Sequence, residues 1–102
     1  MRPVAIGTPP FSREELIASL AEFSELYEER PVKDNQGGMC ASLLFGAWFM
    51  AKKLEPQTII ESGVWKGLGT WFFEKACPSA ELICIDPVPQ NMQYKSPTAK
   101  YF

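Results

Sequence analysis

The stretch "TIIESGVWKGLGTWFFEKACPSAELICIDP", residues 58–87, decides the fold. It opens with a short β-branched run that stops before Gly63, as is typical of a buried parallel strand. Residues 68–76 then place apolar side chains at helical spacing, and residues 81–85 form a second apolar run closed by Pro87. Strand, helix and strand within 30 residues predict a right-handed βαβ unit with two parallel strands.

Two helices are expected before this unit. Residues 12–30 carry apolar side chains three or four positions apart, and Ser12 with Glu15 fits a capping box at the helix start. The apolar stripe of this helix consists of Leu16, Ile17, Leu20, Phe23 and Tyr27. Residues 38–54 are apolar nearly all round until two lysines, which predicts a mostly buried helix.

The rest of the chain has weaker signals. Residues 1–11 contain three prolines without any periodicity, so we expect an irregular lead-in. No clear period follows Pro87. The sequence therefore predicts an α/β protein, the start of a Rossmann-like parallel sheet with only two strands. Such a sheet leaves its edges unpaired, which favours an incomplete domain and makes a homo-oligomer through the exposed sheet edge possible.

Composition excludes several classes of function. The 102 residues are 46% apolar with a net charge of −2, so nothing favours a nucleic acid or an anionic membrane as partner. Histidine is absent, which excludes Ser-His and Cys-His nucleophiles and imidazole ligands. The three cysteines form no C-x-x-C pair, which predicts neither a disulfide framework nor a metal site, and we interpret Cys40 and Cys84 as small buried side chains. With no signal peptide or membrane-spanning run, a cytoplasmic protein is expected.

The chemistry lies where the two predicted strands end. Ligands of open parallel sheets bind beyond the carboxyl ends of the strands, and Glu61 and Asp86 stand there. The glycines after the first strand allow a tight turn and a close approach of a ligand to the backbone. Asp86 follows Gly63 by 23 positions, which suits a carboxylate that accepts hydrogen bonds from ribose hydroxyls. The candidate cofactor-binding residues are Glu61, Ser62, Gly63, Gly67, Gly69 and Asp86.

These residues favour one adenosine-type ligand over others. The dinucleotide pattern G-x-G-x-x-G and the Walker pattern are both missing, which argues against NAD and against a P-loop nucleotide. Glu61 would repel a pyrophosphate but would attract the ammonium group of an amino acid. S-adenosylmethionine combines adenosine with an amino acid and suits both acids. Trp65 and Trp71 could stack on an adenine, although both also suit core positions, and Lys66 could meet a substrate anion.

At these residues the sequence resembles the class I S-adenosylmethionine-dependent methyltransferases. "IIESGVWKGLGTW" is similar to their first motif, and "LICIDP" is similar to the end of their second strand. The resemblance implies that Glu61, Gly63 and Gly67 surround the methionine part of the cofactor and that Asp86 holds the ribose. Trp65 stands where many members have a glycine, and the sequence is in this respect similar to a variant subgroup with an E-x-G-x-x-x-G pattern. Residues 12–102 would then be the N-terminal part of a methyltransferase-like α/β domain of about seven strands.

Two other classes of function stay open from the sequence. The first is another enzyme on the same scaffold, either an NAD-dependent oxidoreductase or a hydroxylase-like relative. The second is a non-catalytic α/β module that serves for interaction or oligomerisation through its sheet edge. The methyl acceptor and a general base are not identified by any residue pattern.

Overall fold

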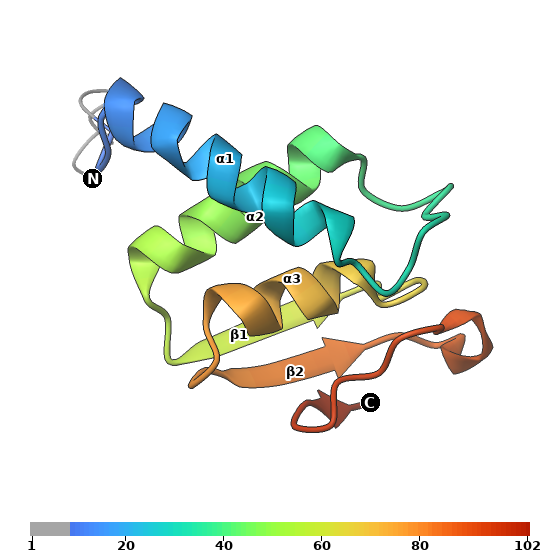
Figure 1. The fold of residues 1–102 in the computed structure, drawn as a ribbon. Helices are drawn as coiled ribbons and strands as arrows, with labels where there is room; N and C mark the ends of the chain where they lie inside the picture. The colour runs from blue at the N-terminus through green and yellow to red at the C-terminus, as the bar shows by residue number, and fades with distance from the viewer. Residues whose placement is uncertain (1–8) are drawn as a thin grey trace, which may run out of the picture.

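The computed structural model describes residues 9–102, so most of the predicted lead-in, residues 1–8, lies outside the described part. Three helices, three strands and one short 3-10 helix follow one another in this part (Figure 1). In chain order they are α1 Arg13–Glu28, α2 Ala41–Leu54, β1 Thr58–Ser62, α3 Leu68–Ala76, β2 Glu81–Ile85, η1 Pro89–Asn91 and β3 Lys100–Tyr101.

The sheet is parallel with the strand order β1-β2-β3. The predicted βαβ unit is confirmed, since Thr58 to Ser62 pair in register with Glu81 to Ile85 and α3 forms the crossover. The prediction of only two strands is wrong, because Ile83 and Cys84 also pair with Lys100 and Tyr101. A strand of two residues has no periodicity of its own. The free edge of β2 creates it by offering backbone groups to pair with.

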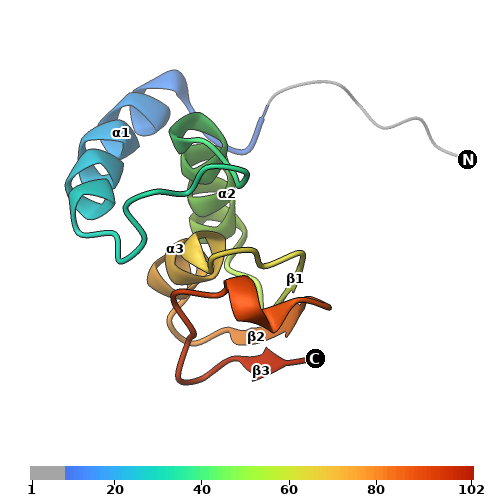
Figure 2. The ribbon, with the colours of Figure 1, turned by 90° about the vertical axis from the view of Figure 1, so that its right-hand side faces the viewer.

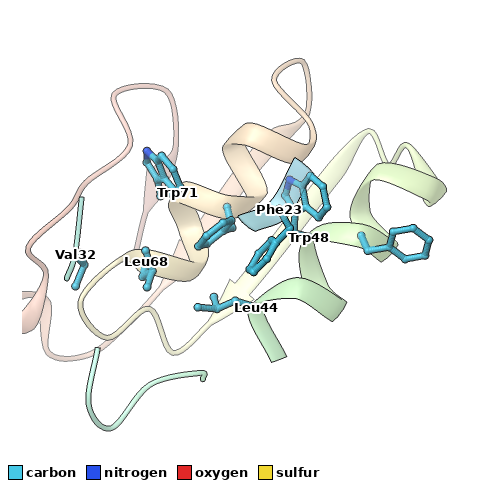
Figure 3. Packing of buried hydrophobic residues seen from close by; sticks show 8 residues of the cluster. Phe23, Val32, Leu44, Trp48, Leu68 and Trp71 are labelled. Carbon is cyan, nitrogen blue, oxygen red and sulfur yellow. The ribbon is translucent and has the colours of Figure 1, made fainter. Parts of the chain in front are cut away.

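All three helices lie on one face of the sheet, with α3 next to the strands and α1 and α2 beyond it (Figures 1 and 2). The core forms between these helices and is rich in aromatic rings that contact one another. Phe23 of α1 lies at its centre, stacked on Phe72 with 5.1 Å between ring centroids and tilted against Trp48 at 5.5 Å. Figure 3 shows Phe23, Trp48, Leu44, Leu68 and Trp71 in this cluster.

The outer faces of α1 and α2 differ from the prediction. Ile17 and Leu20 are 53% and 48% exposed, so only part of the predicted α1 stripe is buried. The expectation that α2 is mostly buried is wrong on one side, because Leu43 and Leu54 are 60% and 66% exposed. The physical reason is that α2 packs between α1 and α3, while nothing among residues 9–102 covers its remaining face.

The start of α1 follows the predicted cap in part. The Ser12 hydroxyl accepts a hydrogen bond from the Glu15 amide at 3.1 Å, which satisfies one of the free amides of the first turn. The Glu15 carboxylate does not complete the capping box and instead pairs with Lys53 of α2 at 2.5 Å. Phe11, at the end of the predicted lead-in, packs edge-on against Phe49 with ring centroids 5.0 Å apart.

The connection from β2 to β3 is held against α3 by one carboxylate. Glu74 of α3 accepts hydrogen bonds from the hydroxyl groups of Tyr94 and Ser96. Ser96 is 5% exposed, and its amide donates to the Tyr101 hydroxyl at 2.7 Å. Burial and the adjacent Glu74 raise the pKa of the Tyr94 phenol, so it stays a donor at neutral pH. These bonds place β3 beside β2.

The sheet has one open face and two open edges, those of β1 and β3, in the described part of the chain. Ile60 and Ile85 are 64% and 42% exposed on strands β1 and β2. Strand β1 pairs only with β2, so pairing of its other edge with a second chain stays a prediction. Within residues 9–102, no helix has the length and apolar character needed to cross a membrane.

We predict that Glu74→Ala lowers the free energy of unfolding by about 2 kcal/mol, because it leaves two hydroxyl groups without their charged acceptor. Urea denaturation followed by circular dichroism measures the change. Glu81→Ala is the matched control, since Glu81 also contacts the β3 region but only through an exposed pair with Lys100 at 3.2 Å. It should cost at most about 0.5 kcal/mol. Equal losses in the two variants would contradict the role given to Glu74.

Candidate functional site

The turn between β1 and α3 has an unusual backbone. Gly63, Trp65 and Gly67 have φ angles of 86°, 57° and 96°, all in the left-handed region. Glycine adopts this region freely, whereas a side chain there costs roughly 1–2 kcal/mol. Gly63 also continues the sheet ladder, since its amide donates to the Ile85 carbonyl at 2.8 Å. The turn therefore begins at the carboxyl end of β1, beside the end of β2.

Asp86 fixes the shape of this turn from the end of β2. Its Oδ2 accepts hydrogen bonds from the Val64 and Trp65 amides at 2.8 and 3.0 Å. Its Oδ1 accepts from the Val88 amide at 2.8 Å. The Val88 bond, followed by the two turn amides, lowers the pKa of Asp86, so it is ionised at neutral pH. The sequence located this acid but gave no sign that it binds the turn backbone.

Glu61 lies beside the first turn of α3. It is half-buried, and its Oε1 accepts a hydrogen bond from the Thr70 hydroxyl. Its Oε2 takes the space that a side chain at Gly69 would fill, because a Cβ there would lie 2.5 Å from it. Burial, with a smaller contribution from the Asp86 charge, raises the pKa of Glu61 to about 6 despite the Thr70 bond. Among residues 9–102, no lysine or arginine pairs with it.

Gly67 serves the packing of the chain against itself. A Cβ at Gly67 would lie 2.1 Å from the Tyr94 carbonyl oxygen, so no larger residue fits. The Lys66 carbonyl accepts hydrogen bonds from the amides of Gln93 and Tyr94 at 2.9 and 3.0 Å. The β2–β3 connection thus crosses directly over the end of the glycine turn.

The side chains of Trp65 and Lys66 reach the connection between α1 and α2. The Trp65 indole donates to the Gln36 carbonyl at 3.0 Å, and the Lys66 ammonium donates to the Asp34 carbonyl at 2.7 Å. The indole ring also lies against Gly37, where a Cβ would be 3.4 Å from it. Trp71, in contrast, is 7% exposed and belongs to the core.

Four of the six predicted site residues line two hollows beside the glycine turn. The first is a cavity of about 50 Å³ that brings together Glu61, Gly63 and Gly69. The second is larger, about 180 Å³, and includes Asp86. Gly67 and the exposed Ser62 line neither of them. Asp86 connects the two, since it lines the second hollow and binds amides of residues that line the first.

Several residues of these hollows were not found from the sequence. The first cavity is completed by Asn35, Gly38, Met39 and Val64, together with Trp65, which the sequence already singles out. The second hollow is completed by Pro89, Met92, Lys95, Tyr101 and Phe102. The run "DNQGG", residues 34–38, signals a turn, but its position over β1 is a tertiary feature. The second set follows Pro87, where the sequence has no period.

Cys40 corrects one prediction on the thiols. Cys84 is 1% exposed, as expected of a small core residue, whereas Cys40 is exposed and precedes the first residue of α2. Its sulfur contacts the Ser42 hydroxyl at 3.2 Å, and this contact lowers the pKa of the thiol. The predicted helix is present, but the burial expected for Cys40 is wrong, because Cys40 is the N-cap that precedes the helix and is exposed.

Comparison with known proteins supports the fold. No protein-family model matches the chain, and no curated protein matches it. The crystal structure of the SAH-bound methyltransferase PaMTH1 from Podospora anserina matches 94% of this chain with a TM-score of 0.53 and 13% sequence identity. The match covers 51% of that methyltransferase, so this chain spans about half its length. The chain thus has a methyltransferase-like α/β fold, a partial form of the Rossmann-like arrangement.

We predict that Glu61→Gln stabilises the protein at neutral pH. The pKa of Glu61 is about 6 in the folded state against 4.5 for the free group, so folding favours the protonated form. The protonated Glu61 therefore contributes fully to the free energy of unfolding below about pH 4.5. This contribution declines as the pH rises through about 6 and is absent at higher pH. At about 1.4 kcal/mol per pKa unit, Glu61→Gln should gain up to about 2 kcal/mol at pH 7.5 and little at pH 4.5.

The measurement is urea denaturation of both proteins at the two pH values. Glu22→Gln is the control, because Glu22 is exposed and pairs only with Lys52 at 2.8 Å. It should change the stability by less than about 0.5 kcal/mol at either pH. A Glu61→Gln variant that is destabilised at pH 7.5 would contradict the interpretation of Glu61 as a carboxylate that folding leaves without a cation.

Proposed function

We propose that this chain is the cofactor-binding part of an S-adenosylmethionine-dependent methyltransferase. The observation that carries the proposal is Glu61, a half-buried carboxylate without a cationic partner among the described residues. It lies at the carboxyl end of β1, beside a glycine turn, where open parallel sheets bind their ligands. The ammonium group of an amino acid moiety is the partner that such a carboxylate lacks.

Asp86 supports the adenosine half of the proposed ligand. A carboxylate can accept about four hydrogen bonds, and Asp86 receives two at Oδ2 and one at Oδ1 from the backbone. Its Oδ1 thus keeps the capacity for one ribose hydroxyl. The adjoining hollow of about 180 Å³ extends from Asp86 to Tyr101 and Phe102, which could contact an adenine. Asp86 at the end of β2 is also the residue that the resemblance to class I methyltransferases implies as the ribose contact.

The donor set thus fits S-adenosylmethionine, which supplies an activated methyl group when bound. The chain's own residues would hold the two polar ends of the cofactor and orient it, and orientation is the main source of rate in a methyl transfer. No residue of the candidate site is assigned as the general base, and the acceptor is left open. The free thiols of Cys40, Cys77 and Cys84 fit a reducing compartment, and a cytoplasmic location is part of the proposal.

Isothermal titration with S-adenosylhomocysteine at pH 7.5 tests this function. Glu61→Gln should weaken binding roughly 10- to 100-fold, the usual effect of losing a hydrogen bond to a charged group. Because the same variant is expected to be more stable than the parent, unfolding cannot explain the loss. Glu22→Gln is again the control and should bind like the parent protein.

The rival functions give different results in the same titration. Binding of NADH without binding of S-adenosylhomocysteine would identify an oxidoreductase on this scaffold and overturn the proposal. Failure to bind either ligand by a folded protein would favour the interaction module. Asp86→Asn separates the two halves of the site, since it should weaken adenosine as well as S-adenosylhomocysteine, whereas Glu61→Gln should leave adenosine binding unchanged.

A further inference from the structure

The connection between α1 and α2 has an internal order of its own. The Asn35 side-chain amide donates to the Met39 carbonyl at 3.1 Å, and the Gly38 amide donates to the Asn35 carbonyl at 2.9 Å. The Gln36 amide donates to the Asp34 carboxylate at 3.1 Å. Residues 34–39 are therefore tied together as a unit, although most of them are exposed.

This unit lies over Glu61. Asn35, Gly38 and Met39 form one wall of the cavity of about 50 Å³, and Glu61 lies on the opposite wall beside Gly69. The methyl carbon of Met39 and Oε2 of Glu61 both approach Gly69, where a Cβ would be 3.0 and 2.5 Å from them. Figure 1 shows the α1–α2 connection at the same end of the molecule as the carboxyl end of β1.

The unit is attached to the glycine turn by two adjacent side chains. Trp65 and Lys66 each donate one hydrogen bond to a backbone carbonyl of the unit, those of Gln36 and Asp34. Both acceptors are main-chain groups, so the attachment does not depend on the side chains of the unit. Val32, 1% exposed, anchors the chain just before it, and α2 begins just after it.

The size of the cavity conflicts with a ligand in this arrangement. Small-molecule sites usually enclose about 300–1,000 Å³, several times the volume beside Glu61. The opposite wall is β1 and α3, whose backbone is fixed by the sheet and the core. The 34–39 unit is the wall that can move, because Asp34 and residues 36–38 are exposed and two hydrogen bonds attach them to the glycine turn, while Met39 at its end packs against the core.

We propose that residues 34–39 form a lid over the Glu61 site, held closed by the Trp65 indole and the Lys66 ammonium. A ligand that reaches Glu61 enters when both bonds break together, and they reform when the lid closes. Trp65 and Lys66 thereby control the rate of entry and exit through the bonds that hold the lid closed. The identity of that ligand rests on the proposed function, but the lid itself does not.

Hydrogen exchange of the Trp65 indole N–H, followed by nuclear magnetic resonance without ligand, measures the opening of the lid. Lys66→Met removes the second bond and keeps the aliphatic stem, so the Trp65 indole should exchange about fivefold faster. The indole protons of Trp48 and Trp71 report the core and should be unchanged. Lys33→Met is the matched control, since Lys33 also donates to a backbone carbonyl, that of Glu28 at 2.9 Å, but does not contact the turn.

Ligand kinetics test the same lid independently. Trp65→Phe keeps a ring beside Gly37 and removes the indole donor, so S-adenosylhomocysteine should associate and dissociate at least threefold faster, as stopped-flow fluorescence would measure. Unchanged Trp65 exchange in Lys66→Met, or unchanged rates in Trp65→Phe, would overturn the lid. If the parent protein binds no S-adenosylhomocysteine, the proposed function fails, and the exchange experiment alone decides for or against the lid.

Discussion

The hydrogen bonds from the turn amides to Asp86 are the interaction on which the candidate site depends. Strands β1 and β2 end side by side, and the turn from β1 to α3 passes the end of β2. The Asp86 carboxylate at the end of β2 fixes this turn by accepting hydrogen bonds of 2.8 to 3.0 Å from backbone amides. Accepting the Val64 and Trp65 amides keeps the turn in its left-handed conformation, which in turn sets the first residues of α3. Glu61 and Gly69 then meet where the absence of a side chain on the glycine leaves room for the carboxylate.

The two acids of the site are consequently unequal, although the sequence presents them as a pair. Asp86 is stabilised as an anion by three backbone amides, whereas Glu61 has one hydroxyl donor and is disfavoured as an anion by burial and by Asp86 itself. A group whose charge is costly in the free protein gains most when a cation binds beside it. This difference is the reason why the proposed function places the amino-acid end of the ligand at Glu61, whereas Asp86 keeps a single acceptor position at Oδ1.

The βαβ unit could be predicted from residues 58–87 because every element in it has a strong local period and a clear boundary. Because the strand ends could be located, Glu61, Asp86 and the glycines of the turn could be identified as candidate site residues, since ligands bind at the carboxyl ends of parallel strands. Strand β3 and the connection before it could not be found, because their structure depends on Glu74 and on the free edge of β2. Residues 34–39 read as a turn, and only tertiary contacts place them over Glu61.

Trp65 belongs both to the motif that could be located from the sequence and to the tertiary contacts that could not. In the motif that the sequence resembles, many members have glycine at this position, and the backbone here keeps a left-handed φ of 57° that glycine would adopt without strain. A tryptophan that accepts such strain must gain interactions elsewhere. Its gains are the bond to the Gln36 carbonyl and the contact with Gly37, both of which belong to the α1–α2 connection. These two contacts offset the strain of the Trp65 backbone. They also explain why tryptophan replaces glycine here, because they attach the turn to the segment that covers Glu61.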